Sequence, residues 1–294
     1  MTRLWSSPLL LLLVTGSLLG ASIPLGKLAG DAGVAPMLWA FVISFGAALV
    51  LFMVLLARGD ARPPDAHRWR YFLVTAAVSY AIPNLLLFSA IPRLGAGYAG
   101  IMFTLSPILT LVFSVILGVR RPDRLGMAGI GTGFAGALLV ALSRGGLDQP
   151  APMLWVLAAM LIPVSLACGN IYRTIDWPQG AGPIELAVGS HAVAAAFLLA
   201  LTLTLGASGG FGSLIAVPGL TLAQMAAAAG MFAVFFRLQA VGGPVYLSQI
   251  GYIAAAVGLL AGTLAFGEHY PPLTWLGVVL IAAGVTMTTR AQAR

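Results

Sequence analysis

Uncharged polar side chains interrupt the long apolar stretches of this sequence, and they are the residues best suited to bind a polar molecule there. Hydroxyl and amide groups donate and accept hydrogen bonds, and aromatic rings pack against the apolar parts of a ligand. In apolar surroundings such groups either bond neighbouring helices together or line a cavity. The candidate lining residues are Ser17, Ser22, Tyr80, Asn84, Tyr98, Met102, Ser106, Ser165, Asn170, Gln224, Gln249 and Tyr252.

Charged groups are nearly missing from the middle of the apolar stretches. All eight acidic residues lie between stretches or at their ends, and His191 is the ionisable residue placed deepest. Membrane proteins that bind a proton or a cationic drug usually do so at a buried carboxylate, so we expect neither ligand here. His191 is either a proton relay or a packed, hydrogen-bonded side chain.

The composition indicates which elements must position these residues. The 294 residues are 60% hydrophobic and 8% charged, with a mean hydropathy of +1.00, whereas soluble domains are about 25% charged. Ten apolar stretches are each about 20 residues long, which suits membrane-spanning helices and exceeds the length of barrel strands. The predicted fold class is all-α integral membrane, with spans near 8–28, 36–57, 70–91, 97–118, 125–142, 153–172, 184–205, 219–239, 244–266 and 273–289.

Basic residues predict the orientation of these spans. With the N-terminus in the cytoplasm, twelve of the 15 Lys and Arg residues, Arg173 among them, face that side. The positive-inside rule therefore places both termini in the cytoplasm, and tryptophans near the span ends support the boundaries. The net charge of +7 belongs to this distribution. It is not clustered on one face, so we expect no nucleic-acid partner.

The chain repeats itself at an offset of 148 residues. This shift lays SLLGASI (17–23) on SLACGNI (165–171) and pairs Ser22 with Asn170. The first span thus has a counterpart that cannot be cleaved, which argues against a signal peptide. Each copy holds five spans, an odd number, so the second copy must enter the membrane the opposite way round. The expected domains are two inverted five-helix repeats, 1–146 and 147–294.

Three stretches resemble the EamA family of the drug/metabolite transporter superfamily. GASIPLGK (20–27) is similar to the first-helix motif, LLFSAIPRLGAGYAGIMFTLSPILTLVFSVILG (86–118) to the third and fourth helices, and FRLQAVGGPVYLSQIGYIAAAVGLLAGTLAFGEH (236–269) to their second copy. The resemblance implies a transporter that exports small metabolites across the bacterial inner membrane, with the amino-acid exporters as the expected branch. Two positions depart from the family pattern, Arg120 in place of Glu and Ala255 where Pro is common.

An inverted repeat predicts a site near the bilayer midplane, among helices that Gly or Pro interrupts in both halves. The gating or coupling candidates are Pro24 and Pro163 on the matching first spans of the two halves, together with Lys27 and His191. Lys27 either snorkels to the interface or attracts an anionic group. An uncharged lining suits a zwitterion with an apolar side chain, such as an amino acid. A nucleotide-sugar or organic-anion carrier is the alternative, and it requires basic residues in the cavity.

Catalysis, cofactors and metals are not expected. GASG (206–209) has the GxSG pattern of rhomboid-like serine proteases, but Ser208 falls in a loop and His269 in a short turn. The histidines lack metal-ligand spacing, and no P-loop for ATP is present. A membrane scaffold without a cavity is a remote alternative.

The expected partners are the lipid bilayer and a small-molecule substrate. Gly129 and Gly133 form a GxxxG pair that suits close helix packing. We expect this packing within a monomer, and a dimer is the alternative.

Overall fold

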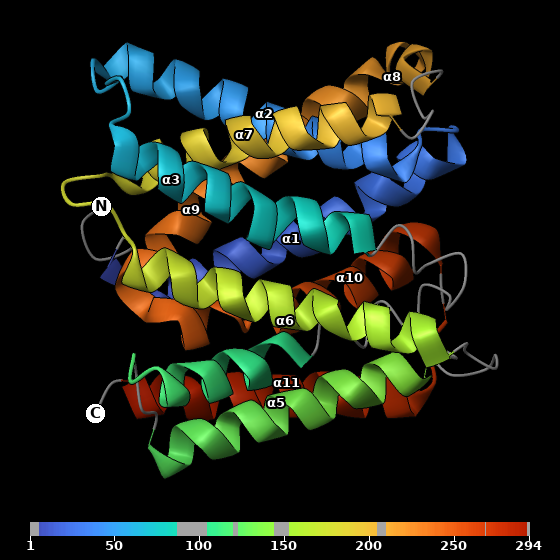
Figure 1. Ribbon diagram of the computed structural model, residues 1–294. Coiled ribbons are helices and arrows are strands. Elements are labelled where there is room, and N and C mark those ends of the chain that lie inside the picture. The colour runs from blue at the N-terminus through green and yellow to red at the C-terminus, as the bar shows by residue number, and fades with distance from the viewer. Residues whose placement is uncertain are drawn as a thin grey trace.

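A bundle of long helices makes up the structure, a computed structural model that describes residues 6–86, 105–119, 123–143, 153–204, 210–267 and 269–292. Within these ranges the regular structure is helical and contains no strand. The long helices lie alongside one another, with their connections at the two ends of the bundle (Figure 1). The helices are α1 (Pro8–Asp31), α2 (Pro36–Arg58), α3 (Ala66–Thr75) and its π-helical continuation η2 (Ala76–Ala81), α5 (Arg124–Ser143), α6 (Met153–Ile175), α7 (Pro183–Thr204), α8 (Phe211–Ala216), α9 (Pro218–Leu247), α10 (Ile250–Phe266) and α11 (Pro272–Gln292).

Six of the described helices are long and apolar enough to cross a membrane. A shorter apolar helix, Leu105–Ile116, lies in the fourth predicted span. Every predicted span coincides with helical residues over most of the part that the structure describes. The ten-span count stays a prediction. The six candidates are Pro8–Asp31, Pro36–Arg58, Leu157–Ile175, Pro183–Thr204, Pro218–Leu247 and Pro272–Ala291.

Local sequence signals set the helix ends. Ser7 caps α1 by accepting a hydrogen bond from the Leu10 backbone N–H at 3.4 Å, and Pro8 occupies the first turn. Asp65 caps α3 in the same way through the Arg68 N–H at 2.8 Å. α2 ends at Gly59, whose φ of 69° is the left-handed conformation that glycine adopts without strain. Such ends need no tertiary contact, which is why the sequence predicts them closely.

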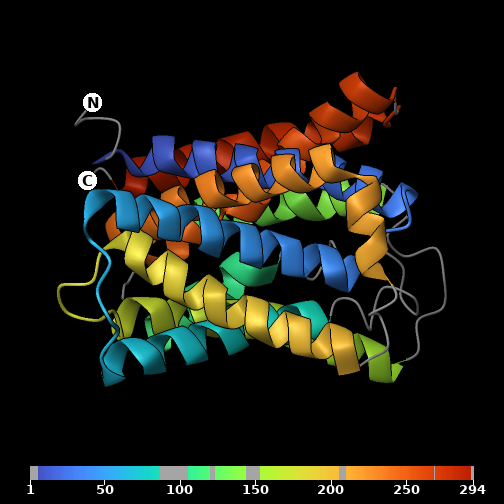
Figure 2. The ribbon, with the colours of Figure 1, turned by 90° about the horizontal axis from the view of Figure 1, so that it is seen from above.

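Both chain ends lie at one end of the bundle. Figure 1 and Figure 2 show the start of α1 and the end of α11 on the same side as the α2–α3 and α6–α7 connections. The outer surface is apolar in stripes. On α6, for instance, Leu154, Leu157 and Leu161 are all more than half exposed. Their helical spacing gives α6 one face suited to lipid and leaves the other face for the interior.

Glycines let α5 and α11 approach closely. A Cβ at Gly129 would lie 2.8 Å from the Gly284 carbonyl oxygen, and one at Gly277 would lie 2.7 Å from the Gly136 carbonyl oxygen. Real Cβ atoms do not come so near, so only hydrogen fits between the two backbones. The expectation that these glycines pack within the molecule is confirmed.

Replacing Gly136 with alanine should push a methyl group against α11, since a Cβ there would lie 2.6 Å from the Gly277 carbonyl oxygen. We expect the free energy of unfolding to fall by about 1–3 kcal/mol, as for other overpacked contacts. The measurement is the melting temperature of the purified protein in detergent.

Gly131→Ala is the matched control on the same helix, because a Cβ there meets no heavy atom within 4 Å. Its melting temperature should stay unchanged or rise slightly, given the higher helix propensity of alanine. Equal melting temperatures for the two variants would contradict the α5–α11 contact.

Candidate functional site

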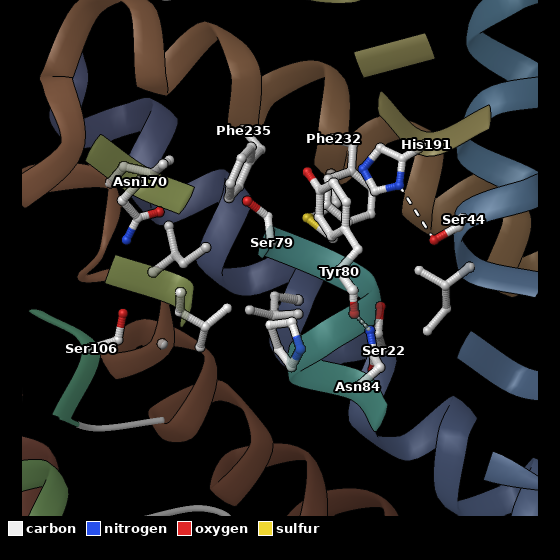
Figure 3. A pocket seen from close by; sticks show the side chains of 18 of the residues that line it. Ser22, Ser44, Ser79, Tyr80, Asn84, Ser106, Asn170, His191, Phe232 and Phe235 are labelled. Carbon is white, nitrogen blue, oxygen red and sulfur yellow. Dashed lines mark hydrogen bonds between the residues drawn. The ribbon is translucent and has the colours of Figure 1, made fainter. Parts of the chain in front are cut away.

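A cavity of about 270 Å³ lies inside the bundle between α1, α2, η2, α6, α7, α9 and α10. Aliphatic and aromatic side chains form most of its wall, and polar groups interrupt them (Figure 3). An apolar wall with a few convergent polar groups is the usual character of a site for a small molecule. The polar lining residues are Ser22, Ser44, Ser79, Tyr80, Asn84, Ser106, Asn170, Arg173, His191, Gln224 and Ser248.

The structure brings part of the predicted set together on this wall. Six of the candidate lining residues and one of the gating candidates border the cavity, although they come from distant parts of the chain. Tyr98 and Met102 lie outside the described residues, as does Ser208. The residues on the wall are Ser22, Tyr80, Asn84, Ser106, Asn170, Gln224 and His191.

Other predicted residues lie away from the cavity and hold helices together. The Ser165 hydroxyl donates to the Val78 carbonyl at 2.6 Å, and Gln249 Oε1 accepts from the Thr288 hydroxyl at 3.0 Å. Tyr252 packs against the place where Gly133 of α5 has no side chain. The remaining residues that do not border the cavity are Ser17, Pro24, Lys27 and Pro163.

The helix continues through Pro24 and Pro163. The irregular backbone occurs elsewhere, at η2, where Pro83 has no N–H to give the Ser79 carbonyl its regular helical partner. The helix widens here into a π-helical turn, in which the Ile82 N–H bonds to the carbonyl of Ala77, five residues earlier. This turn places Ser79 and Tyr80 on the cavity wall.

A second irregularity lies in α9. Gly243 has φ 72° and ψ −179°, which breaks the helix immediately before Pro244. Only glycine adopts this backbone conformation readily. The break falls in the predicted gap between the spans 219–239 and 244–266. It turns the chain so that Ser248 and Gly251 border the cavity.

Arg173 is a site residue that sequence reasoning placed in a loop beyond the sixth span, on the predicted cytoplasmic side, and the structure corrects the loop placement. α6 continues to Ile175, three residues past the predicted end, and carries Arg173 into the bundle at 2% exposure. The signal was its spacing, because Arg173 follows Asn170 by three residues and shares its helix face.

The guanidinium of Arg173 is held by neutral groups. It donates to the Ser79 hydroxyl, to Asn170 Oδ1 at 2.6 Å and to Gln239 Oε1 at 3.3 Å. It also lies 5.0 Å from the centre of the Phe235 ring. None of the ion pairs among the described residues includes Arg173. The site therefore contains a buried cation with uncharged partners.

His191 is fully buried, and Figure 3 shows it across the cavity from Asn170. Its ring centre lies 3.7 Å from that of Phe232 and 4.3 Å from that of Tyr80, and its Nδ1 is 3.5 Å from the Ser44 hydroxyl. Nε2 has no hydrogen-bond partner among the described residues. These contacts favour the packed alternative and leave one polar atom on the ring for a ligand.

Ionic contacts join α3 to the end of α6 beyond the cavity. Asp176 accepts from Arg70 at 2.6 Å and from the Tyr172 hydroxyl at 2.5 Å, and His67 Nε2 lies 3.1 Å away. Burial acts to raise the pKa of Asp176, but the hydrogen bonds from Tyr172, Arg70 and His67 outweigh it and lower the pKa. Asp176 follows Arg173 by less than one turn, so this cluster lies between the cavity and its end of the bundle.

A second ionic contact and an aromatic layer reinforce the same end. Arg68 pairs with Glu185 of α7 at 2.5 Å. Tyr71 of α3 packs against Tyr172 and Trp177, with ring centres 5.8 and 6.4 Å apart. The segments that meet here belong to different halves of the sequence. Contacts between the two halves of the sequence therefore hold this end of the bundle together.

Residues 6–142 match the EamA-like transporter family. The inner membrane transporter YedA of Escherichia coli K12, described as uncharacterized, is 27% identical over 268 residues, which cover 86% of this chain and 81% of YedA. Protein PecM of Dickeya dadantii is 27% identical over 84% of this chain and 80% of PecM. A solved crystal structure with 20% identity covers 98% of this chain and 100% of its own, with a TM-score of 0.76, which indicates the same fold.

The family match and the relatives agree with the apolar helices and the internal cavity. The first half of the chain is thus similar to the EamA-like transporter family, and most of the chain is similar to YedA, which is described as an inner membrane transporter.

Proposed function

We propose that the protein is a secondary transporter that exports small metabolites, with amino acids as its substrates, by alternating access around the central cavity. The observation that carries this proposal is the cavity itself, which residues from both halves of the chain enclose. A scaffold has no need of such a cavity. Of the two residues considered for a serine protease, His269 does not border the cavity and Ser208 lies outside the described residues.

The repeat supports a site shared by two inverted halves, 1–146 and 147–294. The offset of 148 residues pairs Ser22 with Asn170 and Ile43 with His191, and all four residues border the cavity. Helices related by the same offset also pack in pairs, α2 against α7 and α5 against α11. Such pairing is expected when two copies surround a pseudo-two-fold axis in the membrane plane.

The lining supports an amino acid over a larger substrate. Aromatic rings at Tyr80, Phe232 and Phe235 suit an apolar side chain, and the hydroxyl and amide groups suit its polar end. A nucleotide sugar combines a base, a ribose, a further sugar and one or two phosphates, so it is much larger than an amino acid and suits a cavity of about 270 Å³ less well.

Alternating access requires the end of the bundle near Asp176 to open. The contacts of Arg70 with Asp176 and of Arg68 with Glu185 join segments of the two halves at this end. If the halves move relative to each other, these contacts must break. We propose that they hold the cytoplasmic gate.

Purified full-length protein in liposomes should take up labelled leucine or phenylalanine in exchange for the same unlabelled amino acid inside. We expect this exchange without an imposed proton gradient, because no carboxylate lies in the middle of a predicted span. Labelled sugars and nucleotides serve as controls. Exchange of nucleotides but not amino acids would contradict the proposed substrates, and a strict proton requirement lost in His191→Gln would assign a relay to this histidine.

Single cysteines test the orientation, in a chain whose one native cysteine, Cys168, is replaced by serine. A cysteine at Pro64 should react with an impermeant maleimide only from the cytoplasmic side, and one at Gly209 only from outside. Position 64 lies in a loop predicted on the cytoplasmic side, and position 209 lies in a loop predicted on the outside. Labelling of position 209 from the cytoplasm would overturn the ten-span arrangement.

Asp176→Asn should favour opening of the cytoplasmic gate, because it weakens the contacts with Arg70 and His67. The readout is the rate at which a cysteine at Leu166, on the cavity wall, is labelled from the cytoplasmic side. We expect an increase of about 2- to 5-fold, since partly exposed ion pairs contribute about 0.2–1 kcal/mol.

Asp60→Asn in the α2–α3 connection is the control and should leave the rate unchanged.

The lowered pKa of Asp176 means that its contribution to the gate is complete above the ordinary Asp range, about pH 4, and is lost as the pH falls through the lowered pKa. The labelling rate itself rises with pH because the thiolate is the reacting form, so the Asp176→Asn rate is divided by the rate of the unsubstituted gate at the same pH. This ratio should stay constant between about pH 5 and 8. Equal rates in Asp176→Asn and Asp60→Asn would remove Asp176 from the gate.

A further inference from the structure

We infer that Arg173 binds the carboxylate of the transported molecule and thereby restricts the substrates to compounds that carry an anionic group. This inference rests on the proposed function and names the recognition element of the same cavity. It assigns a role to a residue on the cavity wall that is 2% exposed and has neutral hydrogen-bond partners among the described residues.

The charge balance of the site favours an anionic ligand. A buried cation is stable in apolar surroundings when a counter-ion or several hydrogen bonds compensate it. Ser79, Asn170 and Gln239 supply the hydrogen bonds, but none of them supplies negative charge. A carboxylate that enters the cavity would meet a guanidinium that is hydrogen-bonded but has no counter-ion among the described residues.

The donors of Arg173 also fit a carboxylate. The three described bonds use Nε, one hydrogen of Nη1 and one hydrogen of Nη2. A guanidinium has five N–H groups, so each terminal nitrogen has one more to donate. Two N–H groups on adjacent nitrogens match the two oxygens of a carboxylate. The Phe235 ring, 5.0 Å from the guanidinium carbon, packs against the group and limits its movement.

The rest of the cavity suits the remainder of such a ligand. Figure 3 shows Asn170, Ser79 and Phe235 on one side and Phe232, His191 and Ser44 on the other. A ligand whose carboxylate reaches Arg173 would therefore extend its other end towards the aromatic pair of Phe232 and His191. Amino acids with apolar side chains and short carboxylic acids both meet this description.

A purely structural role for Arg173 is the competing explanation, because its bonds to Ser79 and Gln239 tie α6 to η2 and α9. The two explanations differ for Asn170→Asp. This variant keeps the shape of the side chain and places a permanent carboxylate oxygen where Asn170 Oδ1 now lies, 2.6 Å from Arg173 Nη2. A structural arginine would keep its partner and its function, whereas an arginine that binds substrate would have its charge neutralised in advance.

The experiment measures binding of three matched compounds to the purified full-length protein by competition with labelled leucine exchange in liposomes, or by calorimetry in detergent. The compounds are leucine, leucinamide, which lacks the carboxylate, and 4-methylpentanoate, which lacks the ammonium group. For the unsubstituted protein we expect leucinamide to bind about 10- to 150-fold more weakly than leucine, the range for a lost charged hydrogen bond. In Asn170→Asp the affinity for leucine should fall by a similar factor while the melting temperature is retained.

Arg173→Gln should bind leucine and leucinamide equally, and Arg62→Gln in the exposed α2–α3 connection is the matched control for loss of a positive charge. Equal binding of leucine and leucinamide by the unsubstituted protein would overturn the role of Arg173 while leaving amino-acid transport standing. Unchanged leucine affinity in Asn170→Asp would also overturn it. Binding of 4-methylpentanoate but not leucine would support Arg173 and contradict the amino-acid assignment, so the two proposals can fail separately.

Discussion

The rest of the arrangement depends on the hydrogen bonds that hold the guanidinium of Arg173, a full positive charge, inside an apolar bundle. Hydrocarbon offers no water to solvate Arg173, so its acceptors must come from the protein. They come from three segments, Ser79 of η2, Asn170 of α6 and Gln239 of α9. The same segments form walls of the cavity. The segments that supply hydrogen-bond acceptors to Arg173 are therefore the same segments that determine the shape of the cavity.

Irregular and regular backbone have separate places in the molecule. Non-helical conformations are tolerated at membrane depth only where they are buried in protein or line a cavity, and η2 meets this condition through Ser79 and Tyr80. The break at Gly243 lies between the buried residues Gly242 and Pro244. The contact of α5 with α11 is the opposite case, because glycine faces on both helices allow regular backbones to touch. Two of the elements around the cavity, η2 and α9, thus depart from regular α-helical geometry, whereas the contact of α5 with α11 joins two regular helices.

The helices were predictable because hydropathy and capping act locally, and the polar residues at Ser22, Asn84 and Asn170 were predictable because each interrupts an apolar stretch. Arg173 was not, since the positive-inside rule assigns arginines to loops and two of its three acceptors lie 66 and 94 residues away in sequence. Its spacing of three residues from Asn170 was the one local signal. The sites of backbone irregularity were partly predictable. Four of the predicted spans contain an internal proline. The backbone becomes irregular at η2, just before Pro83, but stays α-helical around Pro24, and only the tertiary surroundings decide this difference.

One helix, α6, links the cavity to the ionic cluster around Asp176. Asn170 and Arg173 of α6 border the cavity, and Tyr172 and Asp176, within two turns of them, take part in the ionic cluster with α3. A helix turn is nearly rigid on this scale, since its backbone hydrogen bonds fix the relative positions of residues three or four apart. Any movement of the end of α6 that separates Asp176 from Arg70 must also shift the guanidinium of Arg173 relative to Ser79. Opening of this end and the environment of the buried charge are therefore mechanically coupled.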